Sequence, residues 1–200
     1  MTQNQLIIFA KNTEKGKVKT RLAKDIGDDQ ALLVYQKLLG HTLQVIAQVP
    51  DTDKALYYDS YIPQQDSWKN AHYQQYVQQG LDLGDRMFQA FSAAFKKGYK
   101  RVVLIGTDCP ELLPEHIQTT FTYLQKEPVV IGPAKDGGYY LIGTTEPLKA
   151  LFYNKTWSSP LVLQQTLGTL QAIKRTALLL PTLFDLDDVH DLALFPHFGP

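Results

Sequence analysis

A basic segment follows the first apolar run of the chain and has the composition of a phosphate-binding loop. The residues around Gly16 combine a flexible backbone with cationic side chains, which are Lys11, Lys15, Lys17, Lys19 and Arg21. Lysine offers a point charge and arginine a bidentate fork, so together they can hold a di- or triphosphate. A solvated basic loop without a ligand has the same composition, and the residues alone leave both interpretations open. Two known phosphate loops are excluded, because no G-x-G-x-x-G is present and Gly16-Lys17-Val18 lacks the Ser or Thr of a P-loop.

A carboxylate stands directly after another buried-type apolar run. Residues 101–105 lead into Gly106-Thr107-Asp108-Cys109-Pro110, which places Asp108 just beyond the end of a predicted strand. Mg²⁺ commonly takes one or two protein carboxylates and fills its remaining positions with water and substrate phosphates. Asp108 is therefore a candidate metal ligand, although a turn or a helix cap would also explain an aspartate there.

A second group of acids lies near the end of the chain. Four carboxylates fall within residues 185–191, and they are Asp185, Asp187, Asp188 and Asp191. Asp187 or Asp188 can cap a helix that starts near Val189. Alternatively, one of these acids is a second ligand to the same metal, since a divalent cation relieves the repulsion between clustered carboxylates.

Two further loops combine acids with glycines. Asp136, Gly137 and Gly138 can form a backbone that closes over a ligand, but their spacing favours a plain hairpin turn. Asp85 and Arg86 belong either to a capped loop or to a loop that presents both side chains to a substrate. Spacing alone does not choose between these alternatives.

Other chemistries and partners fit the sequence poorly. Cys109 has no histidine near it in the sequence, so it is expected to be a small buried side chain rather than a nucleophile. The histidines lack the H-x-x-x-H spacing of a zinc hydrolase, and no serine lies in the G-x-S-x-G motif of a serine hydrolase. The 200 residues carry twenty basic and twenty acidic side chains, so no overall field attracts nucleic acid or an anionic membrane. One cysteine favours a reducing compartment, which predicts a cytoplasmic protein, and no apolar run reaches the ~18 residues of a membrane span.

The apolar patterns predict alternating strands and helices in one domain spanning residues 1–200. Strands are expected at 6–10, 55–58, 73–77, 101–105, 129–131, 139–142 and 176–180. Helices are expected from Asp28 to about Pro50, at 84–97, from about 114, at 161–170 and after 188. Residues 11–27 are expected to form a long exposed loop that is too polar to pack as an element. This alternation predicts an α/β sandwich with a mostly parallel sheet, whose ligands bind beyond the carboxyl ends of the strands.

The motifs together resemble a known family. The series comprises A-K-x-x-x-x-G-x-V-K-T-R-L at 10–22, G-T-D-C-P at 106–110, P-A-x-D-G-G-Y-Y-L-I-G at 133–143, W-S-x-P at 157–160 and D-x-D at 185–187. In this order it resembles the bacterial glycosyltransferase-like proteins of the nucleotide-diphospho-sugar transferase superfamily, some of which are associated with arsenosugar biosynthesis. Thr13 stands where a proline is usual in that family, and Asp188 where a threonine is usual.

The resemblance implies a fold, a set of roles and a cofactor. The fold is the GT-A type, a single-domain Rossmann-like α/β/α sandwich with a mixed, mostly parallel sheet, distantly related to molybdenum-cofactor and 2-phospholactate guanylyltransferases. The implied nucleotide-binding residues are Lys11, Gly16, Lys19, Thr20, Arg21 and Thr107. The implied acceptor-side residues are Asp85, Arg86, Asp136, Gly137, Gly138, Trp157 and Ser158. Asp108 and Asp187 are the implied ligands of Mg²⁺ or Mn²⁺, and Asp108, Lys19 and Arg21 are the implied catalytic residues.

Three functions agree with these features. The first is metal-dependent glycosyl transfer from a nucleotide sugar to a small acceptor. The second is nucleotidyl transfer, in which an acceptor phosphate attacks an NTP and pyrophosphate leaves. The third is nucleotide binding without catalysis. The first two need the same cation and the same basic loop, so the sequence does not separate them.

Overall fold

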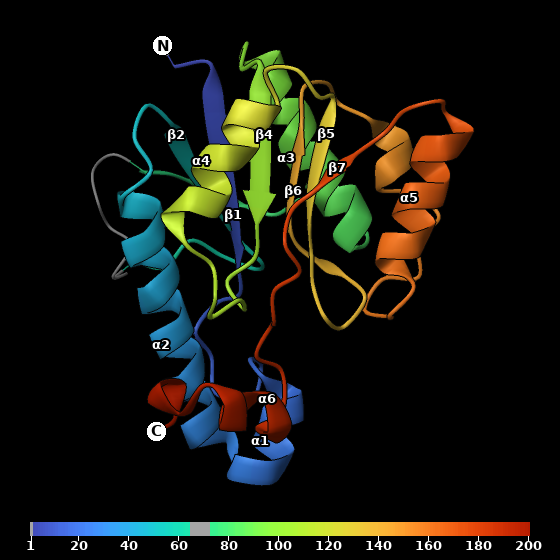
Figure 1. The fold of residues 1–200 in the computed structure, drawn as a ribbon. Helices are drawn as coiled ribbons and strands as arrows, with labels where there is room; N and C mark the ends of the chain where they lie inside the picture. The colour runs from blue at the N-terminus through green and yellow to red at the C-terminus, as the bar shows by residue number, and fades with distance from the viewer. Residues whose placement is uncertain (1, 65–72) are drawn as a thin grey trace.

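The computed structural model describes residues 2–64 and 73–200 and contains one seven-stranded sheet with helices on both faces (Figure 1). The strands are β1 (Asn4–Ala10), β2 (Asp53–Tyr58), β3 (Tyr73–Val77), β4 (Arg101–Ile105), β5 (Val129–Pro133), β6 (Tyr139–Thr144) and β7 (Leu178–Leu179). The α-helices are α1 (Thr20–Ile26), α2 (Asp28–Ala47), α3 (Leu83–Lys96), α4 (Pro114–Tyr123), α5 (Val162–Ala172) and α6 (Val189–Leu194). Two short 3₁₀ helices, η1 (Lys149–Leu151) and η2 (Pro196–Phe198), complete the set in the described residues. No helix among them is both long and apolar enough to cross a membrane.

The sheet is mixed and mostly parallel, as predicted. Its strand order is β3-β2-β1-β4-β6-β5-β7, and only β6 runs against its neighbours. In β1, Ile7 lies opposite Ala55 of β2 and Leu104 of β4. The carboxyl ends of these three central strands therefore meet at one edge of the sheet, which is where an open α/β sheet binds its ligands.

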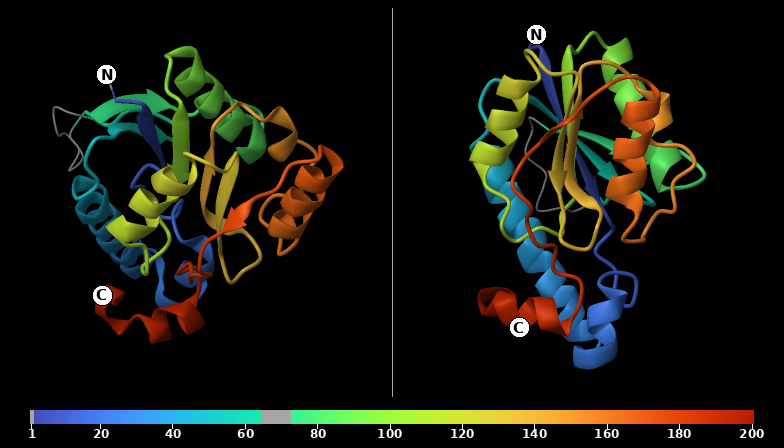
Figure 2. Two further views of the ribbon diagram at one scale, coloured as in Figure 1. Left: turned by 45° about the horizontal axis from the view of Figure 1, so that its top comes forward. Right: turned by 45° about the vertical axis from the view of Figure 1, so that its right-hand side comes forward.

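Alternate residues of the central strands bury opposite faces of the sheet. Leu6 and Ile8 pack with α2 and α4, whereas Ile7 and Phe9 pack with α3 and α5. Figure 2 shows these two helical layers on either side of the sheet. Burial on both faces explains why the run before Lys11 is continuously apolar rather than alternating. On α3, Met87 and Phe91 are buried, and each such side chain contributes roughly 1.5–3 kcal/mol through the hydrophobic effect.

The expectation that residues 11–27 form no element is wrong, because α1 lies within them. Leu22 of α1 is fully buried against the first half of α2 and the C-terminal segment, in a third apolar cluster that includes Leu38, Leu186 and Phe198. In Figure 1 this cluster lies below the sheet, where α1, α2 and α6 meet. Tertiary burial of few apolar side chains therefore stabilises a helix whose own sequence is mostly polar.

Most other predicted elements are confirmed with small changes at their ends. The strand expected at 176–180 shortens to Leu178–Leu179, which pairs in parallel with β5. Residues 134–138 connect the antiparallel strands β5 and β6, so the hairpin interpretation of this segment is confirmed. The hairpin also brings its loop to the same edge of the sheet as the loops after β1 and β4.

Candidate active site at the edge of the sheet

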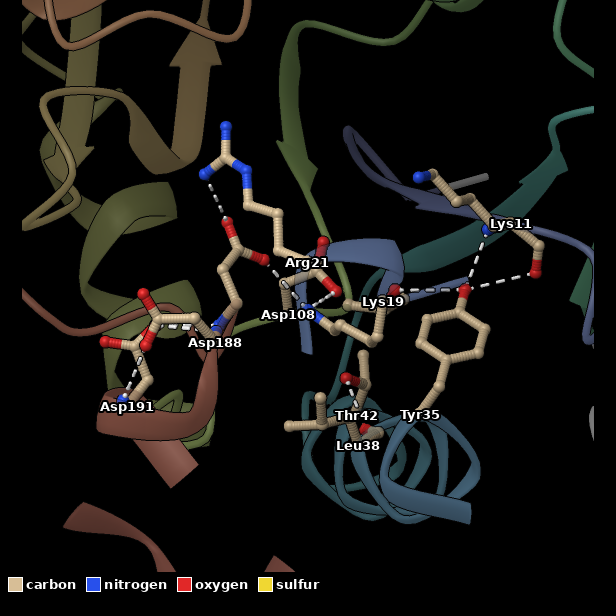
Figure 3. Close-up of polar contacts among 11 residues, drawn as sticks. Lys11, Lys19, Arg21, Tyr35, Leu38, Thr42, Asp108, Asp188 and Asp191 are labelled. Atoms are coloured by element: carbon tan, nitrogen blue, oxygen red, sulfur yellow. Dashed lines mark hydrogen bonds and ion pairs between the residues drawn. The ribbon is translucent and has the colours of Figure 1, made fainter. Parts of the chain in front are cut away.

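A buried lysine joins the two predicted metal ligands. Lys19 precedes α1 with a left-handed backbone (φ 46°, ψ 45°), and its ammonium points back under the sheet edge. Nζ contacts Oδ1 of Asp108 and lies 3.1 Å from Oδ1 of Asp187 (Figure 3). Three segments that are far apart in the sequence therefore meet at one charged group.

The environment of Lys19 differs from the exposed loop expected for it. Its side chain is only 4% exposed, whereas those of Asp108 and Asp187 are 45% and 37% exposed. Burial opposes the charge of Lys19, but the carboxylates of Asp108 and Asp187 outweigh it and hold the pKa of Lys19 above its usual range. The ammonium is therefore charged at neutral pH and serves as counter-ion to both acids.

The other basic side chains of this segment remain near solvent. The side chain of Arg21 is 64% exposed and lies 3.9 Å from Oδ2 of Asp187, and Lys11 is also exposed. Lys15 pairs with Asp29, and Lys17 pairs with Glu14. The structure therefore leaves the arginine and the first lysine accessible to an anion, and Gly16 (φ 77°) and Thr20 are exposed beside them.

Tyr35 of α2 fixes the start of the basic segment. Its hydroxyl accepts a hydrogen bond from the Lys11 amide (2.8 Å), donates one to the Lys11 carbonyl (3.1 Å), and lies 3.5 Å from Oγ1 of buried Thr107 (Figure 3). Sequence reasoning treated Tyr35 only as an apolar member of its helix. Nothing in the local pattern distinguishes a tyrosine whose hydroxyl reaches the site from one that merely packs.

Asn12 anchors the same segment from the other side. The backbone N–H of Asn12 donates to Asp59 (2.6 Å), and its side-chain Nδ2 donates to the Tyr61 carbonyl (2.9 Å). The side-chain Oδ1 accepts from the backbone N–H groups of Ser60 and Tyr61. Asn12 is 4% exposed, so these bonds satisfy a buried amide. It was missed in the sequence, although an asparagine directly after a strand at the binding edge was an available signal.

The late acids divide into two pairs with different roles. Asp188 accepts from the amides of His190 and Asp191, and Asp191 accepts from the amides of Asp187 and Asp188, so these two form the cap of α6. Asp187 instead turns to Lys19 and Arg21. Burial and the nearby carboxylates of Asp108, Asp136 and Asp187, opposed by Lys19, raise the pKa of Asp185 to about 8.

The donor set agrees with a divalent cation, although it is not an assembled metal site. Among residues 2–64 and 73–200, no group of three or more His, Cys, Asp or Glu side chains is arranged to hold a metal. Asp108 and Asp187 nevertheless present partly exposed carboxylates beside the buried ammonium of Lys19, whereas burial and the nearby acids favour the neutral form of Asp185 at pH 7. Two carboxylates fit a cation that is completed by water and substrate phosphates.

The predicted acceptor-side residues form a second cluster around Trp157. Gly84 allows the indole to approach, because a β-carbon there would lie 2.6 Å from its Nε1 and 2.0 Å from the Phe152 carbonyl. Trp157 also meets the ring of Tyr139 edge-on at 6.5 Å. Asp85 accepts a hydrogen bond from the Tyr153 hydroxyl at 2.7 Å, which ties the first turn of α3 to the segment that precedes Trp157.

The hairpin loop packs against the cluster around Trp157 through Gly137. Gly137 (φ 89°) packs so closely on Pro160 that a β-carbon would lie 2.2 Å from the proline carbonyl, and its own carbonyl accepts from the Leu163 amide. Asp136 accepts from the Gly138 amide, which is a local turn contact. Ser158 is exposed with φ 59°, and Arg86 reaches the Gly80 carbonyl. The structure therefore brings the three predicted acceptor loops together, and Asp136 on the hairpin loop lies near enough to Asp185 to raise its pKa.

Two hollows lie elsewhere on the surface. One of about 290 Å³ lies between α4 and β7, and one of about 500 Å³ lies between β3 and α3. Neither is lined by a predicted site residue. Cys109 is buried as expected, and burial raises the pKa of its thiol, which disfavours a role as nucleophile.

Comparisons with known proteins show the family and the fold of this chain. The family model described as "Uncharacterized protein conserved in bacteria (DUF2064)" matches residues 42–159. The chain belongs to this family. No curated protein matches the sequence significantly.

Among solved structures, the DUF2064 chain resembles a "putative nucleotide-diphospho-sugar transferase" from Desulfovibrio desulfuricans G20, with 35% identity over 98% of this chain and 87% of the other and a TM-score of 0.91. It shares its fold with CMP:2-keto-3-deoxy-manno-octonic acid synthetase complexed with CTP (12% identity, 97% and 99% covered, TM-score 0.57). It also shares its fold with the manganese complex of Rv0371C from Mycobacterium tuberculosis H37Rv (12% identity, 97% of each chain covered, TM-score 0.53). These matches establish the nucleotide-diphospho-sugar transferase fold that the motifs predicted.

Proposed function

We propose that this protein is a metal-dependent transferase that moves a sugar from a nucleoside-diphosphate sugar to a small acceptor. The observation that carries the proposal is the charged group of Lys19, Asp108 and Asp187 at the carboxyl ends of β1 and β4. The 35% identical relative supports the donor class, because it is described as a "putative nucleotide-diphospho-sugar transferase". We place the reaction in the cytoplasm, in line with the single unpaired cysteine.

The basic segment is proposed to bind the diphosphate of the donor. Arg21 and Lys11 are exposed and can make charge-assisted contacts with phosphate oxygens, which are stronger than neutral hydrogen bonds. The backbone near Gly16 and Thr20 is exposed beside them and can donate amides. Tyr35 and Thr107 hold the start of the segment against the sheet.

Asp108 and Asp187 are proposed to hold Mg²⁺ or Mn²⁺. When bound, the cation neutralises charge that develops on the departing diphosphate. The manganese complex of a protein with the same fold agrees with this cofactor class. The wall around Asp85, Trp157 and Gly137 is proposed to orient the acceptor, because it lies on loops at the same edge of the sheet.

Calorimetric titration with a panel of NTPs and nucleoside-diphosphate sugars, with and without Mn²⁺, tests the reaction class. Affinity that depends on the sugar supports glycosyl transfer. A preference for bare NTP, together with pyrophosphate release, would assign nucleotidyl transfer instead. Binding without turnover on any acceptor tested would favour a non-catalytic nucleotide-binding protein.

The variant Asp108→Asn tests the metal assignment, with Asp188→Asn as its matched control. Loss of the charge at Asp108 is expected to lower turnover by ~10² or more, comparable to the loss of one major electrostatic group, and to abolish the Mn²⁺ dependence of nucleotide affinity. Asp188 caps α6, and Asn caps about as well as Asp, so the control should behave as wild type. Wild-type Mn²⁺ dependence in Asp108→Asn would refute the assignment.

A further inference from the structure

Lys19 holds one oxygen of each carboxylate that is proposed to bind the divalent cation. Its ammonium contacts Oδ1 of both Asp108 and Asp187 (Figure 3). A small divalent cation binds carboxylate oxygens at about 2.1 Å in a demanding octahedral geometry. A cation bound to either oxygen of these carboxylates would lie within a few ångströms of the ammonium, and the two positive charges would repel each other at such short range.

The backbone of Lys19 is held in place, so an exchange at these oxygens would involve its side chain alone. The backbone of Lys19 is fixed before α1, where its carbonyl accepts from the Ala23 amide (2.8 Å) and Leu22 anchors the helix in the third apolar cluster. Its charge sits at the end of a flexible four-carbon stem. Asp108 and Asp187 are each about two-fifths exposed, so a cation can reach them from the solvent side.

We propose that Lys19 and the divalent cation exchange at the Asp108–Asp187 pair. Without a cation, the ammonium of Lys19 holds the two carboxylates together against their mutual repulsion. When a cation binds, the ammonium leaves the pair and becomes available to the donor phosphates beside Arg21. This inference rests on the proposed function for the phosphates, but the exchange itself requires only the cation.

Mn²⁺ binding without nucleotide, followed by electron paramagnetic resonance, tests the exchange. Lys19→Met removes the charge and keeps most of the apolar stem, and it is expected to bind Mn²⁺ roughly tenfold tighter than wild type because one competing cation is gone. Lys15→Met is the matched control, since Lys15 pairs only with exposed Asp29, and its Mn²⁺ affinity should match wild type. Unchanged or weaker Mn²⁺ binding by folded Lys19→Met, or no binding to either protein, would overturn the exchange.

A measurement on the wild-type chain keeps the inference testable if Lys19→Met unfolds. Amine-reactive labelling with peptide mass spectrometry reports the accessibility of each lysine. Saturating Mn²⁺ should raise the labelling of Lys19 severalfold and leave Lys15 and Lys17 unchanged. Labelling of Lys19 that does not respond to Mn²⁺ would overturn the exchange.

These experiments also separate the exchange from the proposed function. Nucleotide is absent from both, so the exchange stands or falls on Mn²⁺ and Lys19 alone. Failure of wild type to bind any nucleotide in the presence of Mn²⁺ would refute the proposed function and leave the exchange supported by tighter Mn²⁺ binding in Lys19→Met.

Discussion

Two buried tyrosines provide a matched test of how the hydroxyl of Tyr35 stabilises the edge of the sheet. Tyr35 and Tyr58 are 2% and 3% exposed and belong to the same apolar cluster. The Tyr35 hydroxyl makes two hydrogen bonds to the Lys11 backbone, whereas the buried Tyr58 hydroxyl has no hydrogen-bond partner within residues 2–64 and 73–200. Replacement by phenylalanine therefore removes a paired hydroxyl in one case and an unpaired hydroxyl in the other.

The two substitutions are expected to change the free energy of unfolding differently: Tyr35→Phe should lower it, and Tyr58→Phe should leave it unchanged or raise it. Tyr35→Phe leaves the Lys11 amide without its buried partner, and an unsatisfied donor costs about 1–3 kcal/mol. For a chain of this size, 1 kcal/mol corresponds to roughly 2–4 °C in Tm, so Tyr35→Phe should melt about 2–12 °C below wild type. Tyr58→Phe removes a hydroxyl that is desolvated without compensation, so it should be neutral or stabilising by up to about 1 kcal/mol.

Urea unfolding followed by circular dichroism measures both variants under the same conditions. Tyr35→Phe should lower the urea midpoint and leave the m-value unchanged. A lower midpoint at constant m-value means a loss of stability without a change in the surface exposed on unfolding. Equal destabilisation of the two variants would refute the reasoning. It would mean that general packing, and not the bonds to Lys11, determines what the Tyr35 hydroxyl contributes.

Three further predictions concern the loops and caps around the site. Asn12→Ala should destabilise the chain by about 2–3 kcal/mol, because the backbone N–H groups of Ser60 and Tyr61 lose a buried acceptor. Chemical denaturation measures this loss, and wild-type stability of the variant would contradict the anchoring role of Asn12. Gly137→Ala should lower Tm, because its positive φ is strained for alanine and the new β-carbon would clash with the Pro160 carbonyl. Gly168→Ala on α5 is the control: its β-carbon would meet no neighbour, so it should stabilise by about 0.5–1 kcal/mol. Equal effects of the two substitutions on Tm would exclude this explanation. Asp188→Ala should cost about 1 kcal/mol through loss of the α6 cap while Asp188→Asn stays near wild type, and scanning calorimetry should separate the two; a loss shared by both variants would show that charge rather than capping matters.

The sequence predicted the sheet because burial on both faces leaves a local signature. Continuous branched runs such as residues 6–10 and 101–105 cannot be mistaken for half-exposed strands, and the loops that follow them are found at one edge. The capping alternative for Asp188 is confirmed, because an acid before an apolar helical pattern has a local reason to cap. Such features depend on neighbours in the sequence.

The features that sequence analysis missed depend on partners that are distant in the sequence. Lys19 was predicted as a nucleotide-binding and catalytic residue on an exposed loop, and its burial was missed because its partner Asp187 lies 168 positions away. Helix α1 was missed because Leu22 is buried by α2 and the C-terminal segment rather than by a strong apolar stripe of its own. Tyr35 acts through backbone groups of Lys11, and no pattern of residue types reveals such a contact.

The third apolar cluster makes the order of synthesis matter for the site. Leu186 and Phe198 pack against Leu22 and Leu38, and Asp187 reaches Lys19 from the same late segment. While a nascent chain still lacks this segment, Leu22 has no C-terminal cover and Lys19 has only one of its two carboxylates. Contacts between such distant residues pay a loop-closure entropy and form late in folding. A ribosome-bound intermediate can therefore complete the central strands while the end of the molecule that carries Lys19 still exposes Leu22 and Leu38.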